Sequence, residues 1–125
     1  MVVLDASALL AFLFREPGGQ RVATHIPNSC MSTVNLSEVL GRFSRDGHDT
    51  SLILQRLLAS TIEFVPFTEA DASDSASLAP HTRELGLSFG DRACLSLARL
   101  RGLKALTADS AWQQLSLGID VELIR

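Results

Sequence analysis

Short apolar runs without polar alternation recur along the chain, and helical patterns follow them. Val2–Leu4 is one such run, and over Ser7–Phe14 apolar residues then cover every side of a predicted helix. Unbroken apolar runs of this length are typical of strands buried on both faces, and an all-apolar helix is typical of a protein core. The pattern therefore predicts a buried strand followed by a buried helix.

The rest of the chain continues this alternation of strands and helices. Further strands are predicted at Ser29–Ser32, Glu63–Phe67, Lys104–Thr107 and Val121–Ile124. Further helices are predicted over Gln20–His25, over Thr68–Gly86 with a break at Pro80, and over Ala111–Leu115. Three more are predicted with an N-cap: Ser32 or Thr33 caps a helix that runs to about Arg45, Thr50 or Ser51 caps one that runs to about Ala59, and Ser88 caps one that Gly102 ends. This order favours an α/β fold with a parallel sheet, and 125 residues are expected to form one domain.

Composition indicates a packed core and a reducing environment. Hydrophobic residues make up 46% of the chain, and the longest apolar run, Ala8–Phe14, is far below the ~20 residues of a membrane span. The N-terminus lacks the basic region of a signal peptide. Cys30 and Cys94 have no metal-ligand spacing and are interpreted as buried free thiols. We therefore expect a cytoplasmic protein without a membrane segment.

Proteins that bind nucleic acids non-specifically are usually basic, whereas this chain has a net charge of −3, so its composition does not indicate a protein of that class. Lys104 is the only lysine, and every other basic residue is an arginine. Arginine suits bidentate contacts with phosphate or carboxylate, although genome composition explains the same bias equally well. Asp71 and Asp74 are interpreted as helix-terminus and surface charges.

Two aspartates lie at or just beyond the ends of predicted strands. Asp5 comes after Val2–Leu4, and Asp109 comes shortly after Lys104–Thr107. Ligands of open parallel sheets bind at the carboxyl ends of the strands. Aspartate before a helix is also a favoured N-cap, and for Asp5 taken alone the N-cap interpretation is the stronger one.

Two further acids lie in the first turns of predicted helices. Glu38 lies opposite the apolar stripe of its helix, among small or apolar neighbours, and the alternative is a surface ion pair with Arg42. Asp91 stands three residues after Ser88, which predicts a capping box. Asp91 also heads an otherwise apolar stripe, where a carboxylate without a partner is costly.

All four acids are predicted at one edge of the sheet, because strand ends and the following helix N-termini face the same way. Four carboxylates in one cleft cannot all stay ionised without a counter-charge. No histidine or cysteine ligand set accompanies them, and Lys104 begins its strand rather than ending it. The natural counter-charge is Mg²⁺ or Mn²⁺, which activates water for in-line phosphodiester hydrolysis.

Four segments, taken in order, resemble the motifs of PIN-domain ribonucleases. They are Val3–Leu9, Asn35–Val39, Leu87–Leu95 and Leu106–Asp109. Their order and spacing are similar to those of VapC-type toxins of bacterial and archaeal toxin–antitoxin pairs. The resemblance covers nearly the whole chain, and although no single motif is specific, the four together in this order are.

The resemblance implies a PIN-like three-layer fold, with a central parallel sheet and helices on both faces, as a single PIN domain over residues 1–125. It implies RNA cleavage with Mg²⁺ or Mn²⁺, a structured substrate such as tRNA or rRNA, a homodimer, and silencing by a cognate antitoxin. The acids that match the family's metal site are Asp5, Glu38, Asp91 and Asp109, and Ser7 matches the supporting hydroxyl.

We expect Asp5 and Asp91 to be the main metal ligands. Glu38 and Asp109 are expected to ligate the metal or to hold the nucleophilic water, so no covalent intermediate is expected. Many relatives carry a further acid or asparagine near the last motif, where Ser110-Ala111 stands here. A full second metal position is therefore without support.

Two other classes of protein compete with this interpretation. Phosphotransfer enzymes of the haloacid-dehalogenase type and receiver domains also place an aspartate after the first strand. The phosphatases need a second acid where Ser7 stands, and both classes use a lysine near the site, whereas Lys104 is at the wrong end of its strand. A non-catalytic PIN-like scaffold suits the acidic net charge, but it has no need of all four acids.

Overall fold

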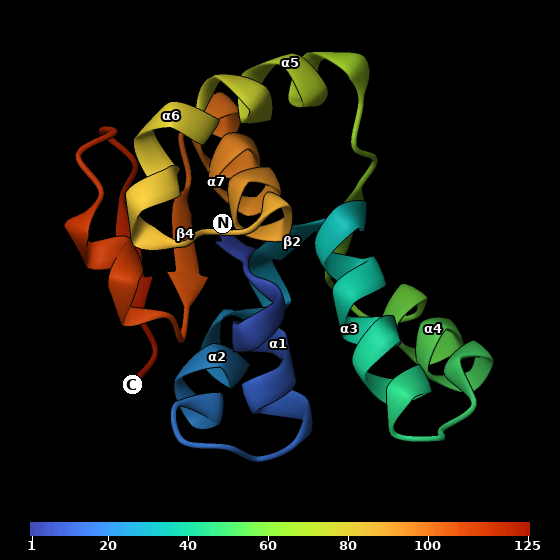
Figure 1. Cartoon of the computed structure of the whole chain (residues 1–125). Coiled ribbons are helices and arrows are strands. Elements are labelled where there is room, and N and C mark those ends of the chain that lie inside the picture. The colour runs from blue at the N-terminus through green and yellow to red at the C-terminus, as the bar shows by residue number, and fades with distance from the viewer.

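A computed structural model describes residues 1–125, and one parallel sheet organises it (Figure 1). The strand order is β3-β2-β1-β4-β5, and every neighbouring pair is parallel. The strands are β1 (Val2–Leu4), β2 (Ser29–Ser32), β3 (Glu63–Val65), β4 (Lys104–Thr107) and β5 (Val121–Leu123). Because β1 is the central strand, the residue directly after it lies at the middle of the carboxyl edge.

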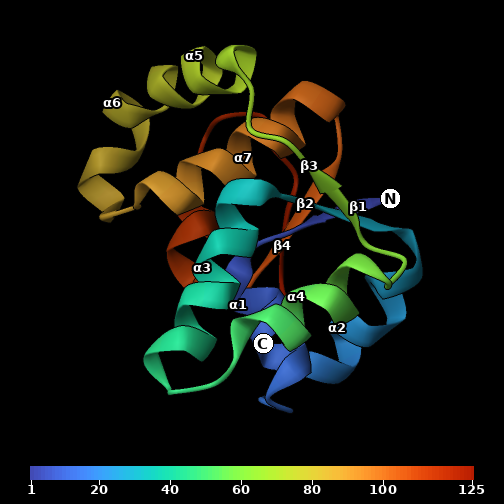
Figure 2. The ribbon, with the colours of Figure 1, turned by 90° about the vertical axis from the view of Figure 1, so that its right-hand side faces the viewer.

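Helices cover both faces of the sheet (Figure 2). On one face lie α5, α6 and α7, and on the other lie α1, α2 and α4. The helices are α1 (Ala6–Leu13), α2 (Gly19–His25), α3 (Thr33–Arg45), α4 (Thr50–Leu58), α5 (Glu69–Ser77), α6 (Ala79–Thr82) and α7 (Phe89–Arg101), with 3-10 turns η1 (Ile26–Asn28), η2 (Arg83–Leu85) and η3 (Ser110–Gln114). The predicted α/β fold, with a central parallel sheet between helical layers, is confirmed.

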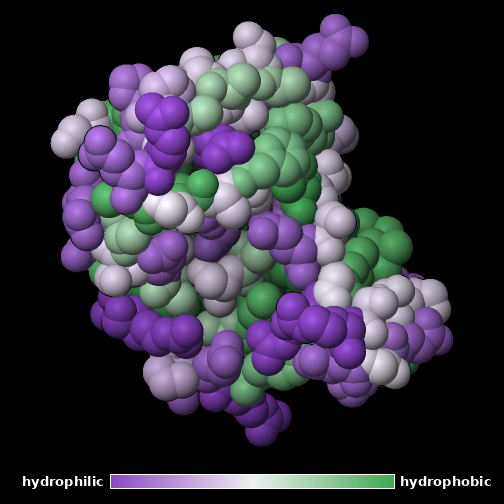
Figure 3. All heavy atoms as spheres, in the orientation of Figure 1, coloured by the Kyte–Doolittle hydropathy of each residue, from purple (hydrophilic) through white to green (hydrophobic).

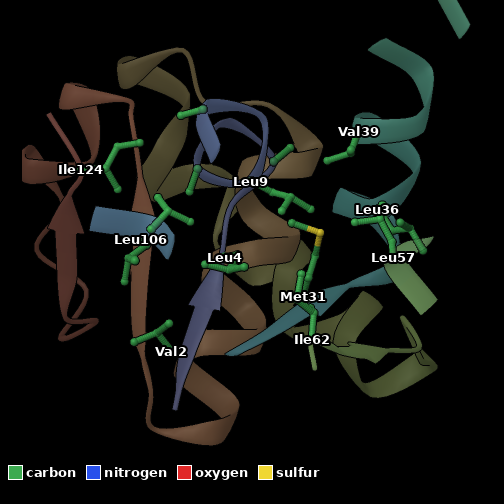
Figure 4. Close-up of a cluster of buried hydrophobic side chains, with 14 residues drawn as sticks. Val2, Leu4, Leu9, Met31, Leu36, Val39, Leu57, Ile62, Leu106 and Ile124 are labelled. Atoms are coloured by element: carbon green, nitrogen blue, oxygen red, sulfur yellow. The ribbon is translucent and has the colours of Figure 1, made fainter. Parts of the chain in front are cut away.

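The residues of β1 alternate between two hydrophobic cores. Val2 and Leu4 belong to one core with Met31 and Leu106 of the neighbouring strands (Figure 4). Val3 points the other way and belongs to a second core. Both faces of β1 are therefore apolar, which is why its sequence shows no polar alternation. All three residues of the strand are buried, which makes β1 a rigid mount for the residue at its carboxyl end.

Local hydrogen bonds move some element boundaries from their predicted places. Asp49, rather than Thr50 or Ser51, caps α4, because its Oδ1 accepts a hydrogen bond of 3.0 Å from the Ser51 N–H. Strand β3 ends two residues early, because the Phe67 N–H donates to the side chain of Thr33 at 3.1 Å instead of to the sheet.

The prediction of Asp74 as a surface charge is wrong. Its Oδ2 accepts a hydrogen bond of 2.7 Å from the hydroxyl of Ser96, which is fully buried, and its Oδ1 lies 2.7 Å from Nη2 of Arg99. Partial burial raises the pKa of Asp74, but the bonds from Ser96 and Arg99 outweigh it and hold the pKa below its ordinary value. Asp74 thus fastens α5 to α7, whereas Asp71 forms the capping box of α5.

Both cysteines are free thiols and are buried, as expected. Burial raises the pKa of the Cys94 thiol well above its ordinary value, so this side chain behaves as a small apolar residue. None of the helices is both long enough and apolar enough to cross a membrane.

Replacing Asp74 tests the link between α5 and α7. We expect Asp74→Ala to lower the free energy of unfolding by about 1–2 kcal/mol, because it removes two hydrogen bonds and leaves the Ser96 hydroxyl buried without a partner. Urea denaturation measures this change. Glu84→Ala, at an exposed acid without a hydrogen bond, is the matched control and should change stability by less than about 0.5 kcal/mol. Equal effects of the two variants would contradict this role.

Candidate active site

Asp5, the first residue of the site, lies directly after β1 and is only 4% exposed. It occupies the N-cap position of α1, but its side chain makes no capping hydrogen bond. Instead, its Oδ2 accepts hydrogen bonds from the hydroxyls of Ser7, at 2.7 Å, and Thr107, at 2.9 Å. The N-cap interpretation of the Asp5 side chain is therefore wrong, and Oδ1 has no hydrogen-bond donor within the protein.

The two hydroxyls that hold Asp5 are themselves held by the end of β4. The Ser7 hydroxyl accepts the Ala108 N–H at 2.9 Å, and the Thr107 hydroxyl accepts the Asp109 N–H at 3.1 Å. Ser7 was a predicted site residue, whereas Thr107 was not. The available signal was the strand register: Leu4 pairs with Leu106, so the next residues along the two strands, Asp5 and Thr107, are neighbours.

Glu38 projects from α3, where Asn35 holds it. The Asn35 Nδ2 donates to Glu38 Oε1 at 2.7 Å and to the Gly90 carbonyl at 3.0 Å. Asn35 is fully buried, and its own Oδ1 has no hydrogen-bond partner. The alternative of a Glu38–Arg42 ion pair is wrong, because Arg42 pairs with Asp46 at 3.2 Å.

Asp91 belongs to the first turn of α7 and closes the predicted capping box. Its N–H donates to the Ser88 hydroxyl at 3.2 Å, and its Oδ2 accepts the Ser88 N–H at 2.8 Å. Its other carboxylate oxygen accepts no hydrogen bond within the protein. Asp91 therefore serves as a helix cap with one oxygen and keeps the second available.

Gly90 brings α3 and α7 close together beside these acids. A Cβ atom at this position would meet both carboxylate oxygens of Glu38. The Gly90 carbonyl also accepts the hydrogen bond from Asn35. The absence of a side chain at Gly90 therefore lets the Glu38 carboxylate pack against the first turn of the helix that carries Asp91.

Three of the four predicted acids and Ser7 line one open cavity of about 540 Å³. The acids come from different elements: Asp5 follows β1, Glu38 lies on α3 and Asp91 lies on α7. Figure 1 shows α1 and α3 side by side. In Figure 3, which has the same orientation, hydrophilic residues gather over the lower part of the molecule where these two helices lie.

Asp109 lies beside the cavity rather than in its wall. Its Oδ1 accepts the Ala111 N–H at 3.0 Å and so caps η3, and its charge adds to the burial that raises the pKa of Asp91. No three acidic, histidine or cysteine side chains of the chain are grouped so that they could together hold a metal ion. The structure thus brings Asp5, Glu38 and Asp91 to one cavity without forming a complete set of protein ligands.

Burial is the largest influence on the ionisation of all three cavity acids. It raises the pKa of Asp5 to about 6, opposed by the hydrogen bonds from Ser7 and Thr107 and reinforced by the charges of Asp91 and Glu38. Burial also raises the pKa of Glu38 and that of Asp91, although both side chains stay partly solvated. The site therefore carries negative charge that the surrounding protein does not fully compensate, and a bound cation would stabilise it.

A family model for the PIN domain matches residues 2–117. The chain belongs to the PIN domain family. All four acids lie within the matched residues. No curated protein matches the chain.

Solved structures share the fold of this PIN domain. One chain of a toxin–antitoxin complex from Klebsiella pneumoniae aligns with a TM-score of 0.74 and 19% identity, covering 100% of this chain and 98% of that one. VapBC2 from Rickettsia felis, bound to a promoter DNA fragment, gives 0.75 and 14%, covering 98% of each chain. DNA-bound VapBC from Salmonella typhimurium gives 0.73 and 15%, covering 100% of each. At these identities the likeness establishes the fold.

Membership of the PIN family goes against the phosphotransfer alternative. The position where those phosphatases need a second acid is occupied by Ser7, whose hydroxyl donates a hydrogen bond to Asp5. Lys104 begins β4 and donates to Glu122 at 3.3 Å, so it serves the sheet and not the Asp5 carboxylate.

Removing the buried charge of Asp5 tests the electrostatics of the site. The rise of the Asp5 pKa from 3.8 to about 6 corresponds to a destabilisation of about 3 kcal/mol at neutral pH. Asparagine removes this penalty, but its amide N–H is poorly satisfied here and reduces the gain in stability. In EDTA near pH 7 we therefore expect Asp5→Asn to raise the free energy of unfolding by about 2 kcal/mol.

The gain in stability that we expect from Asp5→Asn depends on pH, because it comes from removing the charged form of Asp5. The folded protein holds the Asp5 proton more tightly than the unfolded chain, so the charge of Asp5 does not destabilise the fold below the ordinary pKa of 3.8. The destabilisation grows as the pH rises from 3.8 and is complete once the pH has passed the folded-state pKa of about 6. Urea denaturation at both ends of this range measures it. The exposed Asp120→Asn is the control, and a pH-independent effect of Asp5→Asn would contradict the assignment.

A double-mutant cycle tests the packing of Glu38 against Gly90. In a Glu38→Ala background, Gly90→Ala should stabilise the protein by about 0.5–1 kcal/mol, because alanine favours the helix. With Glu38 present, the added Cβ displaces its carboxylate and breaks the Asn35 bond, so this gain should disappear. Thermal or urea denaturation gives the coupling energy, which we expect to be about 1 kcal/mol. Additive effects would mean that the two residues do not interact.

Proposed function

We propose that this PIN domain is a metal-dependent endoribonuclease that acts as the toxin of a toxin–antitoxin pair. The observation that carries the proposal is the convergence of Asp5, Glu38 and Asp91 on one cavity, each with a pKa raised by burial. Their oxygens, with the hydroxyl of Ser7, are the donors that hard divalent cations prefer. The five strands of one sheet span residues 2–123, which supports treating residues 1–125 as one PIN domain.

The donor set fits Mg²⁺ or Mn²⁺ as the cofactor. Mg²⁺ is usually held by one or two carboxylates, with waters and substrate phosphate completing its shell, so a site without three clustered protein ligands suits it. Asp5 and Asp91 would hold the ion, with Glu38 and Asp109 beside them. When bound, such an ion lowers the pKa of water and neutralises phosphoryl oxygens.

The protein's own residues supply orientation for this reaction. Ser7 and Thr107 fix Oδ2 of Asp5, and Ser88 fixes Oδ2 of Asp91. One oxygen of each carboxylate thereby stays available for a ligand. Asn35 holds Oε1 of Glu38 and leaves Oε2 to accept a proton or a hydrogen bond from the attacking water, a role that its raised pKa favours.

The substrate and partners follow from the resemblance to VapC-type toxins. We infer an RNA substrate such as tRNA or rRNA, a cognate antitoxin protein, a homodimer and a cytoplasmic location. The solved structures with the same fold include toxin–antitoxin complexes, which supports the antitoxin. The two free thiols support a reducing compartment. A non-catalytic scaffold remains the competing function, but it gives no reason for the destabilising burial of Asp5.

Asp5→Asn tests the catalytic proposal. We expect it to reduce Mg²⁺- or Mn²⁺-dependent cleavage of RNA by at least about a hundredfold, because the buried carboxylate is one of the two main metal ligands. The readout is the appearance of new RNA 5′ ends with purified protein and total tRNA and rRNA as substrate. Asp120→Asn, the same change at an exposed aspartate without a side-chain hydrogen bond, should cleave like the parent.

Expression in bacterial cells gives an independent measurement. The parent chain should stop growth and Asp5→Asn should not, while both accumulate as folded protein. Cleavage by Asp5→Asn at the parent rate would exclude the assigned role, and a parent protein that cleaves no cellular RNA with either metal would favour the scaffold.

A further inference from the structure

Two arginines line the same cavity as the three acids. Arg42 and Arg45 lie on α3, four and seven residues after Glu38, and both belong to the cavity wall. None of the ion pairs in the structure joins either arginine to Asp5, Glu38 or Asp91. The cavity therefore presents an acidic part and a basic part that do not neutralise each other directly.

Arg42 is held in place by contacts away from the acids. Its Nε donates to Oδ2 of Asp46 at 3.2 Å, and its guanidinium carbon lies 4.8 Å from the centre of the Phe14 ring. Phe14 in turn stacks on Phe43, with ring centres 5.0 Å apart. The terminal nitrogens of Arg42 have no hydrogen-bond acceptor in the protein, so this guanidinium is oriented but not saturated.

Arg45 adds a second, fully available guanidinium. It is exposed and makes no hydrogen bond or ion pair. It follows Arg42 by three residues, a spacing that places both side chains on one face of the helix. The two residues are called the arginine wall below.

A backbone phosphate of RNA is the ligand whose chemistry fits the arginine wall. Guanidinium groups bind phosphate oxygens through paired hydrogen bonds, and free N–H donors are available on both arginines. The chain as a whole carries a net charge of −3, so it has no general attraction for RNA. A phosphodiester chain that reaches the acids therefore needs local positive charge in the same cavity.

We propose that Arg42 and Arg45 bind a backbone phosphate of the RNA next to the one that is cleaved, and so position the scissile bond over Asp5, Glu38 and Asp91. This inference rests on the proposed ribonuclease function and names the part of the cavity that binds its substrate. The two arginines are binding and positioning residues, because the proposed contacts are to a phosphate that does not react.

Binding without cleavage tests the arginine wall. Fluorescence anisotropy of a fluorescein-labelled RNA hairpin in EDTA gives the affinity of the parent protein and of Arg42→Gln, Arg45→Gln and the double variant. We expect each single variant to weaken binding by about fivefold to tenfold. The double variant should lower the slope of log affinity against log salt concentration by up to about 0.9, because the two arginines share one phosphate and each phosphate contact contributes up to about 0.9.

Arg56→Gln is the matched control. Arg56 is exposed on α4, makes no hydrogen bond or ion pair and does not line the cavity, so the variant makes the same change of charge elsewhere. It should leave affinity and salt slope unchanged. Because Arg45 is exposed and makes no hydrogen bond or ion pair within the protein, Arg45→Gln keeps the test decisive even if the loss of Arg42 loosens α3.

Cleavage of the same hairpin in Mg²⁺ separates two kinds of failure. If the parent cleaves and Arg42→Gln and Arg45→Gln bind and cleave like Arg56→Gln, the arginine wall is excluded and the ribonuclease proposal stands. If the parent neither binds nor cleaves the hairpin or total cellular RNA, both proposals fail. Weaker binding and a higher KM confined to the two wall variants would support the wall.

Discussion

The burial of one carboxylate at the end of the central strand is the constraint on which the rest of the structure depends. Strand β1 is apolar on both faces and packs into two cores, so Asp5 cannot move out to solvent without unpacking the sheet. Two hydroxyls compensate one of its oxygens, and they come from α1 and β4. The registration of β4 against β1 is thus also the means by which the protein holds a charge in its interior.

The other acids are placed by the same sheet edge but with more solvent around them. Asp91 satisfies a helix N-terminus with one oxygen, and Asn35 binds one oxygen of Glu38. Each acid therefore has one oxygen fixed by the protein and one left over. Burial raises the pKa of all three, which lowers the stability of the ion-free protein at neutral pH. Such unfavourable burial is characteristic of sites that bind a ligand of opposite charge.

The sequence was sufficient for features that depend on local pattern. The unbroken apolar run of β1 predicted its burial on both faces, and the spacing of Ser88 and Asp91 predicted the capping box. The bond from Thr107 to Asp5 joins residues from opposite ends of the chain, so only the strand register reveals it. The cap of α4 was misplaced because Asp49 stands beside two other residues that favour the same position.

The absence of the alternative Glu38–Arg42 ion pair explains how the cavity keeps both signs of charge. Residues four apart on a helix normally attract each other when oppositely charged. Here Asn35 holds the acid, and Asp46 with the Phe14 ring holds the base, so neither side chain depends on the other. A direct pair would satisfy both groups and leave little binding capacity for outside ligands. Keeping them apart leaves the acid available to a cation and the base available to an anion within one cavity, which is the arrangement that the proposed hydrolysis of a phosphodiester requires.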